Sequence, residues 1–411
     1  MTTASSADTE AGLSLYQLLY PETLADPYPL YHRLRTEDPV HWDPFLHTWV
    51  VTRYADVVAV LQHFLASRSP SPAQLSALGL SGLVPIAEVL VRQMLFLDGA
   101  AHGRIRNLAS AAFTPRRVEA LRPHIQEITD NLLEPVLVTG RMDVIADLAD
   151  PLPAIVTTEM LGLPVPDWPQ LTAWATDFAE ALGNLQHNPD RASRVIQSLS
   201  AMCDYFRNAV EEHRSHRGDD LVCALLHARQ DGDALTIEEV VANCIMLMTG
   251  GQETTTNLIG NGLLALLKHP DQLELMRSSP EMIPPAIEEL LRFESPIQYT
   301  SRLAPADVEM GGKAIQKQQA VIAVIGAANR DPERFPDPDR LDITREDNRH
   351  LAFAWGPHFC FGAPLARMEG QIAFATMLRR LANLQIEPGP LVWRAHLALR
   401  GLTALGVRFS G

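Results

Sequence analysis

A single cysteine stands in an irregular stretch of sequence that could present it to a metal ion. In the segment Phe353–Arg367, FAWGPHFCFGAPLAR, glycines and prolines interrupt any helix or strand that would run through Cys360. A tight loop can turn backbone N–H groups toward the sulfur, and such hydrogen bonds stabilise a thiolate. One thiolate without His or Cys at zinc spacing suits haem iron better than zinc. On the residues alone, a buried structural cysteine stays an open alternative.

A lone acid and a threonine stand in the middle of a long apolar segment. Thr236 followed by Glu239 is typical of a helix start, and the apolar pattern then continues to Lys268. Between Glu239 and Lys268 the one charged residue is Glu253, so we expect this helix to be buried. Its centre, TGGQETTT, weakens a helix with two glycines and adds hydroxyls that bond to backbone carbonyls. Glu253 and Thr254 are therefore candidates for moving protons; helix solubility and backbone capping are the alternatives.

An acid and an arginine three residues apart could form a buried ion pair. Glu289 and Arg292 lie in PPAIEELLRFESP, between apolar residues and just before a proline. Most such pairs lie on helix surfaces and contribute little to stability. A buried pair needs a further partner, which the segment RDPERFPDPDRLDITR could supply.

Composition excludes several classes of function. The 411 residues carry a formal net charge of −15, which argues against nucleic acid as a partner. The N-terminus shows no signal-peptide pattern, and the apolar runs are too short to span a bilayer. Four cysteines without paired spacing argue against a disulfide framework. We expect a cytoplasmic protein that does not enter a membrane.

The elements that would position these residues are mostly helical. Periodic segments from about residue 55 to residue 285 predict helices separated by Pro and Gly. Alternating or short apolar patterns predict strands at Val40–Asp43, Thr48–Thr52, Tyr299–Leu303, Val308–Met310, Ala320–Ile325, Leu397–Leu399 and Gly406–Phe409. The prediction is a mainly α fold with a small β region. The chain is expected to form a single domain over 1–411, with 1–15 as a disordered tail.

Together these motifs resemble those of soluble bacterial cytochromes P-450, the haem-thiolate monooxygenases, along essentially the whole chain. The family's haem-loop pattern, Phe-Gly-x-Gly-x-His-x-Cys-x-Gly, matches Phe353, Gly356, His358, Cys360 and Gly362. Its Glu-x-x-Arg pattern matches Glu289 and Arg292, with Arg340 as the expected third partner. Its oxygen-activating motif matches residues 250–255. Two positions depart from the pattern: Ala354 replaces the usual Gly, and Gly250 stands where Ala is more frequent.

The resemblance implies a cofactor and a reaction. The cytochrome P-450 fold would hold haem b between the long central helix and the loop of Cys360, its metal ligand. The residues expected to hold the haem propionates are His102, Arg106, Arg302 and His358. The implied activity is insertion of one atom of dioxygen into a hydrophobic small molecule, as hydroxylation or epoxidation in secondary metabolism. The substrate pocket would include Ile245, Thr249, Gly250, Ile297 and Gln298, and a carboxylate anchor at Arg68 or Arg92 is left open.

The resemblance also implies redox partners. Electrons would come from NAD(P)H through a ferredoxin reductase and ferredoxin to a chain that is expected to be monomeric. A basic face on the thiolate side would receive the ferredoxin, built from Arg104, Arg106, Arg116, Arg117, Arg367, Arg379 and Arg380. One alternative is a peroxide-driven haem-thiolate peroxygenase, which the absence of Arg between Val240 and Leu267 disfavours. A non-catalytic haem sensor or carrier is the other alternative.

Overall fold

The computed structural model describes residues 12–183, 192–215, 218–229 and 232–410. Residues 1–11 of the predicted disordered tail lie outside this range. For residues 12–15 the prediction is wrong, because this segment packs against the first strands. Leu15 is fully buried, and the Ser14 hydroxyl donates to the Asp43 carboxylate at 2.8 Å. The Asp43 carboxylate also accepts the Leu15 N–H at 2.8 Å.

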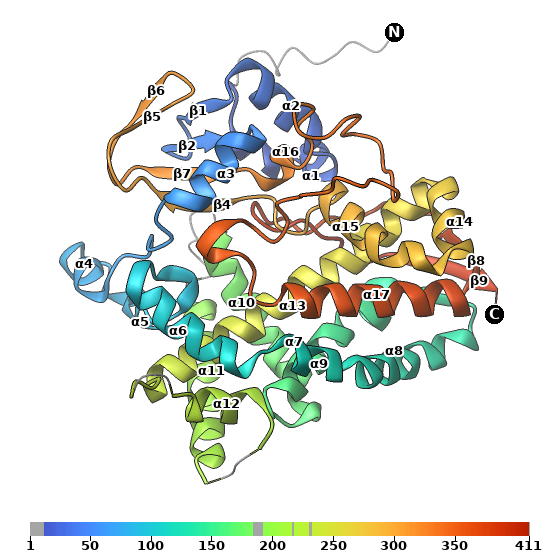
Figure 1. Ribbon diagram of the computed structural model, residues 1–411, viewed down its shortest axis with the longest axis horizontal. Helices are drawn as coiled ribbons and strands as arrows, with labels where there is room; N and C mark the ends of the chain where they lie inside the picture. Colours follow the sequence, from blue (N-terminus) through green and yellow to red (C-terminus); the bar gives the residue numbers. More distant parts are fainter. Residues whose placement is uncertain (1–11, 184–191, 216–217, 230–231, 411) are drawn as a thin grey trace.

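Helices make up most of the described chain (Figure 1). They are α1 (Pro21–Ala25), α2 (Tyr28–Glu37), α3 (Tyr54–His63), α4 (Pro72–Ala77), α5 (Val84–Leu90), α6 (Gly99–Ala112), α7 (Pro115–Ala120), α8 (Arg122–Leu137), α9 (Pro151–Met160), α10 (Trp168–Gly183), α11 (Ala192–His213), α12 (Leu221–His227), α13 (Ile237–Lys268), α14 (Pro270–Ser278), α15 (Ile283–Phe293), α16 (Ile325–Ala328) and α17 (Ala363–Arg380). The prediction of a mainly α fold with a small β region is confirmed.

The strands form three small sheets. The largest has the order β1-β2-β7-β4, the second β3-β9-β8, and β5 pairs with β6 alone. Their bounds are β1 (Val40–Asp43), β2 (Thr48–Val51), β3 (Arg141–Asp143), β4 (Thr300–Leu303), β5 (Val308–Met310), β6 (Lys313–Ile315), β7 (Ala320–Ala323), β8 (Ala382–Ile386) and β9 (Gly406–Ser410). The largest sheet joins residues 40–51 to residues 300–323, and the single domain over 1–411 stays a prediction.

One predicted strand is absent from the sheets. Residues Leu397–Leu399 contribute a single bridge, from Leu399 to Ile297. The reason is local: His396 Nδ1 accepts the N–H groups of Ala398 and Leu399 at 3.1 and 3.0 Å, so these amides do not enter a ladder. Strands β3, β6 and β8 were not predicted, because their short polar sequences lack a clear alternation.

The long helix α13 passes through the centre of the protein, where it packs against α9, α10, α11, α15 and α17 (Figure 1). Its predicted start is confirmed: Thr236 and Glu239 form a capping box, and the helix runs for 32 residues. Its first half belongs to one apolar core and its second half to another. Residues 249–254 belong to neither core. The helix therefore carries its polar centre between two apolar clusters.

Candidate active site

Two backbone N–H groups act on the sulfur of Cys360, those of Gly362 and Ala363. The Cys360 N–H donates to the Phe353 carbonyl at 2.9 Å, which closes the loop. Burial raises the pKa of the Cys360 thiol, while the N–H of Gly362, the Arg106 guanidinium and the N–H of Ala363 act in the opposite direction. These donors would stabilise a thiolate once a cation shares its charge.

Backbone conformation explains two residues of this loop. Gly356 has φ +73°, and a Cβ there would lie 2.8 Å from Gln62 Oε1, so glycine is required. Ala354 also lies in the left-handed region, with φ 58°. Its methyl group therefore costs about 1 kcal/mol relative to the family's usual glycine. Phe353 is buried, and the Arg367 guanidinium lies 4.5 Å from the centre of its ring.

Two histidine rings lie against each other at this loop, and one of them contacts an acid. The rings of His102, on α6, and His358 are 4.2 Å apart between centroids. Nε2 of His358 lies 3.3 Å from Asp98 Oδ1. Burial, followed by His102 and Arg302, lowers the pKa of His358 to about 4, so the imidazole is neutral at pH 7. Burial also lowers the pKa of His102.

Two arginines complete this group. Nη2 of Arg106 donates to the Phe359 carbonyl at 2.7 Å, within the Cys360 loop. Arg302, on β4, is 2% exposed, and burial lowers its pKa to about 10. Its Nη1 donates to the Thr300 hydroxyl at 2.9 Å. The structure thus brings His102, Arg106, Arg302 and His358 to one side of the Cys360 loop.

These residues fit a haem group. In the described part of the chain, Arg302 Nε and His102 Nε2 are buried donors or acceptors without a hydrogen-bond partner. Carboxylates would satisfy such groups, and haem carries two propionates. A Cβ built at Gly362 or Gly250 would meet no described atom within 4 Å. The chain therefore leaves space at the start of α17 and at the centre of α13.

The acid on the central helix forms an ion pair that the sequence did not predict. Arg394 Nη1 lies 3.6 Å from the Glu253 carboxylate, and Nη2 lies 3.3 Å from Asp150 Oδ1. Burial raises the pKa of Glu253, while Arg394 lowers it. An acid with a raised pKa can give and take protons near neutral pH. One residue on, the Thr254 hydroxyl donates to the Gly250 carbonyl at 2.9 Å.

The Glu289–Arg292 pair is buried, as the resemblance implied, but its third partner differs from the prediction. Both side chains are fully buried and joined by bonds of 2.7 and 2.8 Å. Arg345 Nε approaches Glu289 Oε2 at 3.2 Å, and Asn348 Nδ2 donates to the same oxygen at 3.0 Å. The prediction of Arg340 is wrong: this residue offers its carbonyl to Arg292 at 3.2 Å.

The residues predicted to line a substrate pocket lie in different surroundings. Ile245 and Thr249 are buried in α13, and Gly250 is exposed on the same helix. Ile297 packs in the apolar core near the largest sheet. Gln298 is turned elsewhere: its amide donates to the Ser295 carbonyl at 2.6 Å. Its side chain contributes to a separate small cavity with Tyr31 and Trp393, so we remove it from the predicted pocket.

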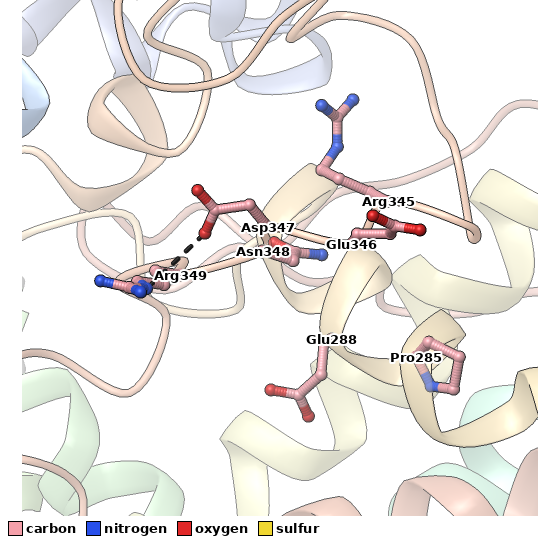
Figure 2. A pocket seen from close by; sticks show the side chains of 7 residues that line it. All are labelled: Pro285, Glu288, Arg345, Glu346, Asp347, Asn348 and Arg349. Carbon is pink, nitrogen blue, oxygen red and sulfur yellow. Dashed lines mark ion pairs between the residues drawn. The ribbon is translucent and has the colours of Figure 1, made fainter.

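A surface pocket of about 520 Å³ lies between α15 and the segment that supplies Arg345 (Figure 2). Its lining residues are Pro285, Glu288, Arg345, Glu346, Asp347, Asn348 and Arg349. Figure 2 shows Glu288 across from the segment 345–349. Although burial opposes it, hydrogen bonds from His350 and Arg367 lower the pKa of Glu288 to about 2. Glu288 therefore ties α15 to α17.

Most of the predicted basic face is neutralised. Arg104 pairs with Glu239 and Asp233, and Arg367 pairs with Glu288 at 2.7 Å. Arg379 and Arg380 both approach Asp130, at 3.5 and 3.1 Å. Arg116 and Arg117 at the start of α7 are exposed. Four of the seven arginines of the predicted face therefore have an acidic partner among the described residues.

A family model described as Cytochrome P450 matches residues 167–389. The chain belongs to the cytochrome P450 family. It is 40% identical over 408 residues to Cytochrome P450 CYP107DY1 of Priestia megaterium, covering 95% of this chain and 97% of that one. It is 38% identical to the cytochrome P450 monooxygenase PikC of Streptomyces venezuelae, covering 94% of this chain and 91% of that one.

A solved structure of the family shares the whole architecture. The crystal structure of P450BioI in complex with an acyl carrier protein carrying hexadec-9Z-enoic acid aligns with a TM-score of 0.89 and 36% identity. The alignment covers 95% of this chain and 99% of that one. As a cytochrome P450, this chain is a haem-thiolate monooxygenase with a haem-iron cofactor. In the described ranges, we find no helix that is both long and apolar enough to cross a membrane.

Sequence reasoning missed three residues of the site. Asp98 accepts from His358 and from the N–H groups of Ala66 and Ser67, at 3.0 and 2.8 Å. Arg394 approaches Glu253 from a distant segment, and the same guanidinium also pairs with Asp150. Spacing could not reveal these contacts, since each joins elements that meet only in the folded chain.

Proposed function

We propose that this cytochrome P450 binds haem b and that Cys360 would be the ligand of its iron. The observation that carries the proposal is the convergence of His102, Arg106, Arg302 and His358 at the Cys360 loop, where two of them have buried nitrogens without a partner among the described residues. The guanidinium groups would hold the propionates by charge, and the neutral imidazoles would hold them by hydrogen bonds. When bound, haem would supply the binding and activation of dioxygen.

Glu253 and Thr254 would carry protons to the reaction site. Burial raises the pKa of the Glu253 carboxyl, which favours the protonated form that a proton donor needs. Thr254 would take a proton from Glu253 on a lone pair of its oxygen and give up its own hydrogen, which donates to the Gly250 carbonyl in the structure. Turning the hydroxyl away from that carbonyl would direct the departing proton toward the open space beside Gly250. The transfer would leave Glu253 ionised, Arg394 would stabilise that negative charge, and a proton from solvent would restore the acid.

The substrate would be a hydrophobic small molecule of polyketide, terpenoid or fatty acyl type, in secondary metabolism. Apolar residues of α13 and neighbouring helices surround the polar turn at residues 249–254. Curated relatives include a polyketide biosynthesis cytochrome P450 from Bacillus subtilis and 6-deoxyerythronolide B hydroxylase from Saccharopolyspora erythraea. An apolar cavity with few polar groups is typical of sites for such molecules.

Electrons would arrive from NAD(P)H through a ferredoxin reductase and ferredoxin. The exposed Arg116 and Arg117 lie at the start of α7, and Arg106 belongs to α6, the preceding helix. An acidic ferredoxin would be attracted to this narrow positive surface. Monomeric state and cytoplasmic location stay predictions from the sequence.

The ligand assignment is tested with Cys360→Ser. We expect the variant to lose the strongly red-shifted Soret band that a thiolate-ligated haem gives in the reduced carbonyl complex. If the band persists, another residue is the ligand and the assignment fails.

The proton route is tested with Thr254→Ala, with Thr256→Ala as the matched control. Thr256 lies on the same helix, but its hydroxyl donates to the Ala149 carbonyl at 2.9 Å. In Thr254→Ala, NAD(P)H consumption should continue while product per NAD(P)H falls and hydrogen peroxide rises. Thr256→Ala should keep the wild-type ratio. Unchanged coupling in Thr254→Ala would remove this residue from the proton route without affecting the haem assignment.

A further inference from the structure

Three side chains that could bind a metal meet far from the Cys360 loop, where α11 ends and α12 begins. His213 is the last residue of α11, Asp220 precedes α12, and Cys223 lies in the first turn of α12. One ligand atom from each lies within 4.8 Å of the others. Nitrogen, carboxylate oxygen and sulfur together form a donor set that zinc accepts.

The histidine is oriented as a metal ligand would be. Nδ1 of His213 lies 2.7 Å from the Ala209 carbonyl, so this nitrogen carries the hydrogen. Nε2 of the neutral ring then offers a lone pair, and it faces Asp220 Oδ1 at 3.7 Å. This separation is too long for a hydrogen bond. Two ligands of one tetrahedral zinc ion lie about 3.3 Å apart, so a small closure would complete the site.

The sulfur has a backbone donor. The Gly218 N–H donates to Cys223 Sγ at 3.4 Å, an interaction that supports a thiolate. Sγ also lies 4.0 Å from the His213 carbonyl, at the limit for a thiol hydrogen bond. Cys223 is 1% exposed, whereas the side chains of His213 and Asp220 are 15% and 17% exposed. Water can therefore reach the open side of the cluster.

The turn at Gly162 lies close against two of the three side chains, those of Asp220 and His213. Gly162, in the turn after α9, has φ +76°, and a Cβ there would lie 2.6 Å from Asp220 Cγ and 2.9 Å from His213 Nε2. Only glycine allows this close approach. A metal at this point would tie the end of α11 to the start of α12, beneath the turn at Gly162.

We propose that His213, Asp220 and Cys223 form a zinc site, with water as the fourth ligand. This site is separate from the haem, and its existence does not depend on the proposed function. Binding would release the thiol proton and place Zn²⁺ between Nε2, a carboxylate oxygen and Sγ.

The test measures Zn²⁺ bound by the full-length, haem-loaded protein, by competition with a fluorescent zinc chelator. We expect one Zn²⁺ per chain in the wild type, and a loss of affinity of about 100-fold or more in Cys223→Ala and His213→Gln, since each removes a direct ligand. Zn²⁺ should also raise the unfolding temperature of the wild type but not that of Cys223→Ala. Cys223→Ser keeps the side-chain volume and serves if the alanine variant does not fold.

Two matched controls isolate the site. Cys203→Ala removes a thiol of α11 that lies outside the proposed site. His124→Gln removes a histidine that pairs with a different carboxylate, that of Glu159. Both should bind Zn²⁺ as the wild type does. Equal binding by wild type and Cys223→Ala would overturn the proposal, because the metal would then be held elsewhere. Absence of binding by the wild type at about 10 μM Zn²⁺ would also overturn it.

Discussion

The carboxylate of Glu253, at the centre of α13, lies 3.6 Å from Nη1 of Arg394, which belongs to the segment before the last strand. The same guanidinium reaches Asp150, so one cation serves two partly buried acids. Burial raises the pKa of Glu253 and of Asp150, and Arg394 lowers both. The charge state of the central helix thus depends on a residue from the far end of the chain.

Replacing Arg394 by Gln should therefore destabilise the protein in a pH-dependent way. Without the cation, the native pKa of Glu253 rises further above its unfolded value. The unfolded chain then releases its proton first, and native stability is lost as pH rises above the ordinary glutamate pKa of 4.5. We expect a loss of about 2 kcal/mol at pH 8 and less at pH 5, measured from urea unfolding midpoints. Arg394→Lys keeps the charge and is the control; a loss independent of pH would contradict this account.

The Glu289 network predicts unequal roles for two arginines of one loop. Arg345→Gln should lower the free energy of unfolding by about 1–3 kcal/mol and reduce the haem-loaded fraction, because Glu289 loses a buried partner. Arg340→Gln should change it by less than about 0.5 kcal/mol, since its backbone carbonyl makes the contact. The exposed Glu346 supplies a neutral control, Glu346→Gln. The reverse order for Arg345 and Arg340 would restore the prediction made from the sequence.

The buried Glu369, on α17, should make the protein less stable as pH rises. Burial raises its pKa to about 8, opposed by a hydrogen bond with Thr255, and one of its oxygens is buried without a partner in the described ranges. Because the native pKa lies above the unfolded value, the stability present below pH 4.5 is lost as pH rises toward 8. Glu369→Gln removes this titration, so its stability relative to wild type should increase by roughly 4 kcal/mol between pH 4.5 and 8. A constant difference across this range would mean that Glu369 titrates normally.

Reversing charge at the start of α7 should slow electron delivery. We expect Arg116→Glu with Arg117→Glu to reduce the rate of first-electron transfer from ferredoxin about tenfold at low salt, without changing substrate affinity. The wild-type rate should fall as ionic strength rises, since salt screens attraction between exposed charges. Arg379→Glu is the comparison, because Arg379 already approaches Asp130. If neither the charge reversal nor added salt changes the rate, ferredoxin docks on another surface.

Local signals in the sequence predicted much of the framework. Thr236 and Glu239 marked the start of α13, and lack of charge along the segment indicated its burial. The local residues left a surface pair open for Glu289 and Arg292, and only the family resemblance implied the buried pair that the structure shows.

Contacts between distant segments could not be predicted in this way. Arg340 and Arg345 lie in one arginine-rich segment, and only the path of the backbone decides which side chain reaches Glu289. Gln298 was predicted to line the substrate pocket, but its side-chain amide donates to the Ser295 carbonyl. Asp150 and Arg394 carry no motif at all, because their role comes from the fold that brings them to Glu253.

The parallel pairing of β2 with β7 joins a strand that is synthesised early to a strand that is synthesised late. Thr48–Val51 leaves the ribosome early, but its partner Ala320–Ala323 follows only after most of the chain has been made. At about 5–20 residues per second, the β1–β2 hairpin waits on the order of half a minute for that partner. An isolated hairpin is marginally stable in water, and the edge of β2 that will pair with β7 stays unpaired during this time. The nascent N-terminal segment therefore carries an open strand edge until β7 has been made.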